Sequence, residues 1–125
     1  MSHAINWFEI PVTDLDRAMA FYATVTGRAL QRMEFGVPGQ QEAVFETADQ
    51  NERTGSLVQS AELKPAQVGA VVYLNVEDDL DDCLKRVTAA GGSVALGKTA
   101  LPPGMGSFAQ ILDTEGNKIG LHSAA

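Results

Sequence analysis

Residues 5–30 read INWFEIPVTDLDRAMAFYATVTGRAL, and residues 69–94 read GAVVYLNVEDDLDDCLKRVTAAGGSV. Each stretch runs in the same order through an apolar strand, an acidic turn, an amphipathic helix and a glycine. Val12 lies 64 positions before Val76, and the leucines that start the two helices are offset by 65, so one inserted residue in the acidic turn aligns the copies. Such a repeat decides the fold, because each copy is one supersecondary unit.

The first copy predicts a strand followed by a helix. In residues 7–12 the even positions are apolar, whereas the odd positions mix Trp, Glu and Pro, which is typical of a strand with one buried face. Asp14 stands where a helix N-cap belongs, and the apolar residues from Leu15 onward fall at helical spacing until Gly27. The second copy has the same pattern and closes on a Gly-Gly pair.

Three shorter apolar segments separated by turn residues follow each helix. They are 29–35, 42–47 and 54–60 in the first half and 93–96, 107–113 and 117–122 in the second. Each half therefore reads as one strand, one helix and three strands, which predicts an α+β fold. We expect a single domain made of two repeats, residues 1–61 and 69–125 joined by 62–68, because each repeat alone is near the lower size limit for an independent core.

Composition excludes several function classes. The chain has 125 residues with 9 basic and 16 acidic side chains, and its formal net charge of −7 disfavours binding to nucleic acid. A single cysteine, Cys83, permits no internal disulfide, which favours a cytoplasmic location. No run of eighteen uncharged apolar residues occurs, so we expect no membrane span.

Three motifs carry a resemblance to a known family. They are IPVTDLDRA at 10–18 with Phe21, Tyr22 and Gly27 behind it, AAGG at 89–92, and DTEGNKIGL at 113–121. These residues resemble the vicinal oxygen chelate superfamily, which contains glyoxalase I, bleomycin resistance proteins and extradiol dioxygenases, and most of all its predicted enzymes related to lactoylglutathione lyase. The resemblance implies paired βαβββ modules that form a curved eight-stranded cup, a small-molecule ligand in that cup, and a homodimer.

The resemblance also implies a metal site whose usual ligands are missing here. Active relatives hold a divalent metal on four strand residues, and the matching positions in this chain carry Trp7, Val71, Gly120 and Gln59. Of these only Gln59 has a donor atom, and one amide oxygen is too little for a stable divalent site. We therefore predict no cofactor at the usual positions and no glyoxalase I activity.

Glu9 and His122 offer a displaced alternative. The two-residue period of a strand places Glu9 on the same face as Trp7, and His122 on the same face as Gly120. As metal ligands they would be only two donors, which is a weak site. Without metal, a carboxylate beside Trp7 in an apolar cup has a raised pKa and suits a general base. The plain interpretation is a hydrogen-bonded carboxylate and a half-exposed histidine without chemistry.

Aromatic residues predict the walls of a ligand pocket. Trp7, Tyr73 and Phe108 suit a flat or apolar small molecule, although each is also an ordinary core residue. Gln59 and Asn75 would add polar groups to the same ligand pocket. The loop PPGMG at 102–106 is either a lid over the cup or a plain surface connection.

Two function classes remain open from the sequence. The first is a glyoxalase-like lyase or isomerase that uses Glu9 as base with His122 opposite, on an unknown substrate. The alternative is a non-catalytic protein of the bleomycin-resistance type that binds or sequesters a small molecule and needs no metal. A metal-dependent dioxygenase or fosfomycin-type transferase is disfavoured, because the His and Glu ligands of those enzymes are missing.

Overall fold

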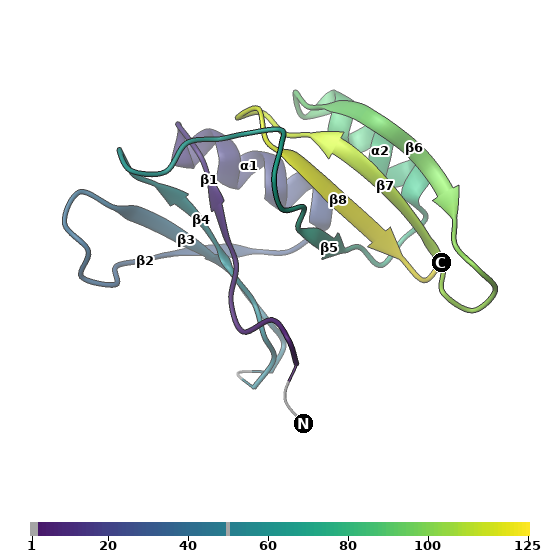
Figure 1. Cartoon of the computed structure of the whole chain (residues 1–125), viewed down its shortest axis with the longest axis horizontal. Coiled ribbons are helices and arrows are strands. Elements are labelled where there is room, and N and C mark those ends of the chain that lie inside the picture. Colours follow the sequence, from purple (N-terminus) through teal and green to yellow (C-terminus); the bar gives the residue numbers. More distant parts are fainter. Residues whose placement is uncertain (1–2, 50) are drawn as a thin grey trace.

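The computed structural model describes residues 3–49 and 51–125 and contains two βαβββ units side by side (Figure 1). The first unit consists of β1 (Glu9–Pro11), α1 (Leu15–Thr26), β2 (Leu30–Met33), β3 (Gln41–Phe45) and β4 (Ser56–Gln59). The second consists of β5 (Tyr73–Asn75), α2 (Leu80–Ala89), β6 (Ser93–Ala100), β7 (Ser107–Leu112) and β8 (Lys118–Ser123). The predicted α+β class and order of elements are confirmed.

Each unit forms its own four-stranded mixed sheet. The strand orders are β1-β4-β3-β2 and β5-β8-β7-β6, and in both sheets the first strand pairs in parallel with the last. The two sheets therefore have the same topology, as an internal duplication requires. No ladder joins them among the described residues, so the eight strands curve as two separate halves with both helices on one side (Figure 1).

The predicted helix ends have the expected caps. Asp14 is extended, and its carboxylate accepts a hydrogen bond from the Arg17 N–H at 3.1 Å. Gly27 ends α1 in the left-handed region at φ 71°, where its N–H donates to the Ala23 carbonyl. Asp79 caps α2 in the same way as Asp14 caps α1, by accepting from a backbone N–H of the first turn.

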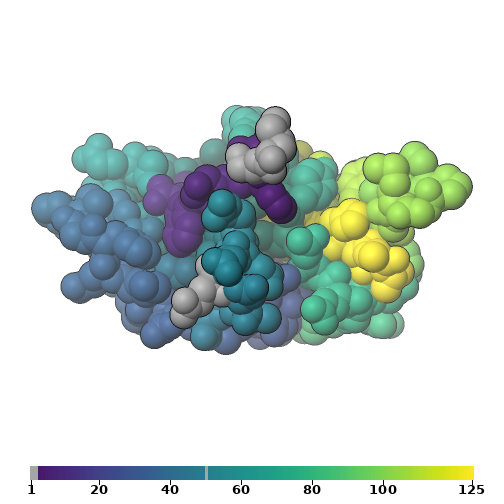
Figure 2. Space-filling model, turned by 90° about the horizontal axis from the view of Figure 1, so that it is seen from below, coloured from purple at the N-terminus to yellow at the C-terminus, as the bar shows by residue number. Residues whose placement is uncertain are grey.

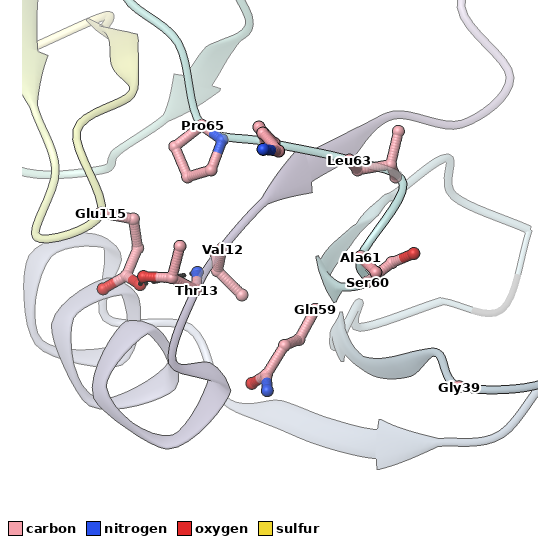
Figure 3. A pocket seen from close by; sticks show the side chains of 10 residues that line it. Val12, Thr13, Gly39, Gln59, Ser60, Ala61, Leu63, Pro65 and Glu115 are labelled. Carbon is pink, nitrogen blue, oxygen red and sulfur yellow. Dashed lines mark hydrogen bonds between the residues drawn. The ribbon is translucent and has the colours of Figure 1, made fainter.

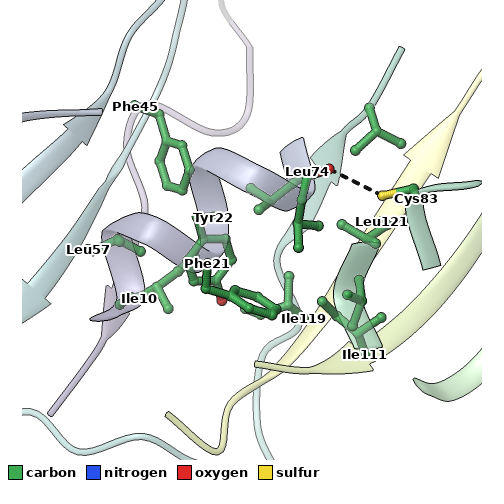
Figure 4. Close-up of a cluster of buried hydrophobic side chains, with 14 of the residues drawn as sticks. Ile10, Phe21, Tyr22, Phe45, Leu57, Leu74, Cys83, Ile111, Ile119 and Leu121 are labelled. Atoms are coloured by element: carbon green, nitrogen blue, oxygen red, sulfur yellow. Dashed lines mark hydrogen bonds between the residues drawn. The ribbon is translucent and has the colours of Figure 1, made fainter. Parts of the chain in front are cut away.

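One hydrophobic core serves both units. Ile10 and Leu57 of the first unit belong to the same buried cluster as Leu74 and Leu121 of the second (Figure 4). Helices α1 and α2 meet within it, where the Cys83 thiol lies 3.4 Å from the Val25 carbonyl oxygen. Because the cluster is continuous, each unit covers apolar surface that the other would otherwise expose to water.

Two hairpin connections project at opposite ends of the molecule. The connection between β2 and β3 lies at one end and the loop between β6 and β7 at the other (Figure 2). Strand β6 is longer than predicted, because register shifts between Val94 and Leu96 and between Leu96 and Thr99 let it continue to Ala100. No helix among the described residues is long and apolar enough to cross a membrane.

The turn between β7 and β8 fastens the second unit to the first. The Glu115 carboxylate accepts hydrogen bonds from the backbone N–H groups of Thr13 and Asp14, both at 2.9 Å. It also accepts from the Arg17 Nε at 2.7 Å. These donors stand at the start of α1, so Glu115 places negative charge at the positive end of that helix.

Asp113 and Asn117 complete the same joint. The Tyr22 hydroxyl of α1 donates to the Asp113 carboxylate at 2.5 Å, and the Asn117 amide donates to the Pro11 carbonyl at 2.7 Å. Burial, together with the Asp113 charge, raises the pKa of Tyr22 well above its ordinary value. The DTEGN motif is thus more than the hairpin turn that the sequence predicts, because it joins residues about a hundred positions apart.

We expect the Glu115 joint to make stability depend on acidity. Burial raises the pKa of Glu115, but hydrogen bonds from Arg17 and Thr114 outweigh it and hold the pKa at about 2 instead of 4.5. Because the folded pKa is the lower one, this stabilisation is complete above pH 4.5 and is lost as the pH falls toward 2. Glu115→Gln should lower the free energy of unfolding at pH 7 by about 2 kcal/mol.

Urea denaturation between pH 2 and pH 7 measures this effect. The variant should lose part of the wild-type pH dependence below pH 4.5. Asp82→Asn is the matched control, because Asp82 is exposed and its Lys85 partner is 4.0 Å away. Equal stability of Glu115→Gln and wild type at pH 7 would contradict the role given to this joint.

Candidate functional site

Strand register assigns the predicted site residues to sheet faces. In the second sheet Leu74 pairs with Leu121 within the core, so their neighbours Tyr73 and His122 lie on the face away from the helices. In the first sheet Ile10 is the core residue of β1, and Glu9 accordingly lies on the outer face of that sheet. We call these two outer faces the open faces.

The open face of the second sheet carries a cavity of about 380 Å³, which we call the aromatic pocket. Its lining residues are Tyr73, Asn75, Leu101, Phe108 and His122. The rings of Tyr73 and Phe108 meet edge to face with centroids 6.1 Å apart, and the Gln110 amide donates to the Tyr73 hydroxyl at 2.8 Å. The sequence had singled out four of these lining residues, all except Leu101. It had not singled out Gln110, which contacts the aromatic pocket through its hydrogen bond with Tyr73.

His122 connects the aromatic pocket to the loop between β6 and β7. Its Nε2 lies 2.7 Å from the Met105 carbonyl oxygen, which can only accept a hydrogen bond. Nε2 therefore donates in this hydrogen bond, which leaves Nδ1 available for a polar contact with a ligand. The predicted lid segment is thus anchored beside the aromatic pocket, whereas its movement stays a prediction.

The Tyr73 ring occupies the space that a side chain at position 120 would need. A Cβ atom at position 120 would lie 2.2 Å from the Tyr73 Cδ1 and 2.3 Å from its Cε1. No side chain fits there while the ring keeps its place. The resemblance assigns a metal ligand to this position, and the structure shows that such a side chain and the present Tyr73 ring exclude each other.

Glu9 lies apart from the aromatic pocket. It borders a cavity of about 170 Å³ whose lining also includes Lys64 and Lys118. Partial burial and the nearby charge of Glu42 raise the pKa of Glu9. Within one chain the structure therefore places Glu9 and His122 in different cavities on different sheets.

Glu42 is a polar site residue that the sequence reasoning missed. It is only 5% exposed on the open face of the first sheet, where the Ser56 hydroxyl and the Gln40 amide donate to its carboxylate, both at 2.9 Å. The only signal was a glutamate directly before the apolar run at 43–45. Glu9 and Glu42 together make this open face acidic.

Gln59 lies outside the aromatic pocket, so the structure does not bring it together with the other predicted pocket residues. Its amide oxygen accepts from the Leu15 N–H at 2.8 Å, so it caps α1 from the neighbouring strand. It borders a separate cavity of about 710 Å³ with Val12 and Glu115 (Figure 3). The cause is strand parity, because Gln59 shares the helix-facing side of β4 with Leu57.

Trp7 also stands outside the aromatic pocket. Its ring meets Phe35 edge to face with centroids 6.1 Å apart, and the side chain is 39% exposed. It therefore extends the apolar surface of the first unit, whereas the aromatic pocket belongs to the second.

The donor set does not fit a divalent metal. Within residues 3–49 and 51–125, no three His, Cys, Asp or Glu side chains gather closely enough to hold a metal ion. The shifted pair of Glu9 and His122 is divided between two cavities in one chain. Two donors in separate cavities are too few to hold a divalent metal within one chain.

Sequence comparison assigns the family. Residues 4–121 match the Glyoxalase/Bleomycin resistance protein/Dioxygenase superfamily, and the chain belongs to it. A glyoxylase-like domain-containing protein from Didymella fabae is 33% identical over 114 residues, which cover 90% of this chain and 88% of the relative. The expected superfamily is confirmed.

Solved structures share the fold. TnmS3, an antibiotic binding protein from Streptomyces sp. CB03234, is 27% identical with a TM-score of 0.65, covering 100% of this chain and 98% of that one. Glyoxalase I from Zea mays is 20% identical with a TM-score of 0.69, and the chain spans about half its length (95% of this chain, 45% of that one). The fosfomycin resistance protein FosX from Listeria monocytogenes is 15% identical with a TM-score of 0.67, covering 98% and 94%.

We expect Gly120 and Tyr73 to be energetically coupled. Gly120→Ala should displace the Tyr73 ring, break its hydrogen bond with Gln110 and lower stability by about 1 kcal/mol. In a Tyr73→Ala background the same change should cost little, because the obstacle is gone. A double-mutant cycle by urea denaturation measures the coupling, and additive effects would show that the ring does not require the glycine.

Proposed function

We propose that this chain binds and sequesters a flat, largely apolar small molecule in the aromatic pocket. The observation that carries the proposal is the Tyr73 ring, which packs against Gly120 at the position that the resemblance assigns to a metal ligand. An aromatic wall stands there instead of a carboxylate. TnmS3, an antibiotic binding protein, is 27% identical across the whole chain, and this supports a binding role.

The chemistry of the aromatic pocket suits such a ligand. Tyr73 is 45% exposed, so its ring is free to stack on a planar group, with Phe108 set at an angle beside it. Asn75 and the His122 Nδ1 supply a few polar contacts, which orient a ligand within an otherwise apolar cavity. Apolar walls with few polar groups favour binding over proton transfer.

A lyase or isomerase is the second candidate, and one observation favours it. Burial and the Glu42 charge raise the pKa of Glu9, which is what a general base near neutrality needs. Glu9 and His122 would have to come from two copies of the chain to act on one ligand, because one chain separates them. This candidate therefore depends on a dimer.

We expect Tyr73→Ala to weaken the binding of 2-naphthol, a planar probe, by about fivefold, because a lost aromatic contact is worth about 1 kcal/mol. Tyr73→Phe is the matched control, since it keeps the ring and loses only the hydrogen bond with Gln110. Isothermal titration calorimetry measures both affinities. Equal affinity in Tyr73→Ala and wild type would remove the aromatic pocket from the proposal.

The same titration separates sequestration from catalysis. Glu9→Gln and chelator-treated wild type should bind 2-naphthol as untreated protein does, because neither Glu9 nor a metal contacts the ligand in this proposal. Weaker binding after chelation, with a stoichiometric metal found by elemental analysis, would show a metal-dependent site instead. Weaker binding in Glu9→Gln alone would favour the lyase or isomerase.

We further propose that a second copy of the chain covers the open faces in a homodimer. Met33 and Phe35 of the first unit are 43% and 50% exposed, and Leu96 and Tyr73 of the second are 42% and 45% exposed. Large apolar side chains gathered on both open faces are typical of a surface that another subunit covers. The two units are also copies in topology, which suits a two-fold assembly.

Sedimentation velocity tests the homodimer. Wild type should sediment as a dimer, and the double variant Met33→Glu with Leu96→Glu should sediment as a folded monomer, because charges on covered faces oppose association. The control Val68→Glu changes an 87% exposed residue outside the strands and should leave the dimer intact. A monomeric wild type at all concentrations would exclude this arrangement.

A further inference from the structure

Five of the nine basic residues are neutralised by carboxylates in this acidic chain. Ion pairs join Arg17, Arg32, Lys85, Arg86 and Lys98 to acidic partners. Among the described residues, the four remaining basic side chains have no carboxylate within ion-pair distance. They are Lys64 and Lys118, which border the Glu9 cavity, and Arg28 and Arg53.

Arg28 and Arg53 line one cavity between the two units, which we call the seam cavity. It has a volume of about 140 Å³ and lies where the end of α1 and the connection between β3 and β4 face β5. Arg28 follows Gly27, the end of α1, and Arg53 precedes β4. The two guanidinium groups therefore reach one space from different parts of the first unit.

The other polar groups of the seam cavity suit a ligand with oxygen atoms. Thr26 and Thr54 already donate their hydroxyl protons to backbone carbonyls of Tyr22 and Phe45. Asn75 lines the cavity and forms no side-chain hydrogen bond with any described residue. Its amide N–H groups and the two guanidinium groups are thus hydrogen-bond donors that a ligand can use.

A partly buried arginine without an ion pair points to an anionic ligand, although Arg28 also borders a neighbouring cavity that contains Glu77 and Asp78. Arg28 is half-buried, so its guanidinium has lost part of its hydration without gaining a carboxylate in return. Guanidinium groups bind carboxylates and phosphates through paired, charge-assisted hydrogen bonds. The volume of the seam cavity is several times the share of one water molecule, about 30 Å³, so one oxyanion group fits.

Glu52 is the one carboxylate that lines the seam cavity. It is exposed and forms no ion pair with either arginine. Its charge opposes an anion in the cavity, so the local balance is one positive charge, and removing it should strengthen anion binding.

The seam cavity adjoins the aromatic pocket. Tyr73 and Asn75 of β5 line both cavities. A planar ligand in the aromatic pocket would thus carry a substituent past β5 toward Arg28 and Arg53.

We propose that the seam cavity binds an oxyanion, and that the ligand of the aromatic pocket is an aromatic acid whose anionic group lies between Arg28 and Arg53. The part concerning the aromatic acid rests on the proposed function, whereas oxyanion binding stands on the seam cavity alone. The local pair of arginines overcomes the net negative charge of the chain at short range.

Titration of ¹⁵N-labelled protein with inorganic phosphate at constant ionic strength tests the seam cavity. We expect saturable chemical-shift changes at the backbone amides of Thr26, Arg28 and Asn75. Arg28→Gln and Arg53→Gln should each weaken binding by about tenfold or more, and Glu52→Gln should tighten it. Lys118→Gln is the matched control, because it removes an equally unpaired charge from another cavity.

Two results would overturn oxyanion binding. One is the absence of saturable shifts in wild type, and the other is an equal loss of affinity in Lys118→Gln and the two arginine variants. Arg53 is exposed on a connection, so Arg53→Gln should keep the fold even if the half-buried Arg28 does not tolerate replacement. The spectrum of each variant without phosphate reports on its fold.

A second pair of probes tests the aromatic acid. 2-Naphthoate should bind wild type at least about tenfold more tightly than its uncharged amide, and Arg28→Gln or Arg53→Gln should abolish that preference. Phosphate binding without binding of either naphthalene compound would refute the aromatic pocket and keep the seam site. Equal affinity for both compounds without phosphate binding would refute the seam site and keep the proposed function.

Discussion

The Glu115 carboxylate is the contact on which the arrangement of the two units depends. It lies in a turn of the second unit and accepts hydrogen bonds from backbone N–H groups at the start of α1 in the first unit. Because α1 also carries the buried rings of Phe21 and Tyr22, fixing its start fixes how the shared core is filled. Asp113 and Asn117 add hydrogen bonds from the same turn to Tyr22 and to the Pro11 carbonyl. The five residues 113–117 therefore form the turn between β7 and β8 and also join the second unit to the first.

The relative position of the two units determines which residues line the cavity between them and which residues lie on their open faces. The seam cavity exists only where the end of α1 and the connection before β4 face β5, so its two arginines depend on the joint made by Glu115. The open faces of the sheets carry different chemistry. The first presents Glu9 and the buried Glu42, and the second presents aromatic rings with His122. A ligand or a second copy of the chain would meet both kinds of surface.

The aromatic pocket shows how one fold accommodates a different site. A superfamily fold carries its chemistry in a few side chains, and their exchange leaves the scaffold intact. Here Tyr73 lies against Gly120, so the ring and the missing side chain depend on each other. Gly120 lies on the open face, whereas the side chain of the next residue, Leu121, is buried in the core on the other face. The missing side chain therefore leaves no gap in the core. A side chain at position 120 and the Tyr73 ring in its present place thus exclude each other.

Strand and helix patterns in the sequence were enough for the class, the duplication, the caps of the first helix and the faces of the first strand in each repeat, because period-2 and helical spacing are local properties. Register then brought Tyr73, Asn75, Phe108 and His122 together as predicted from that pattern. Gln59 was predicted from aligned positions and not from strand parity, and the structure places it apart from these residues, where it caps α1. The role of Glu115, the burial of Glu42, the separation of Glu9 from His122 and the meeting of Arg28 with Arg53 were decided only by tertiary structure. Each depends on contacts between segments far apart in the chain, and no local period records how those segments meet.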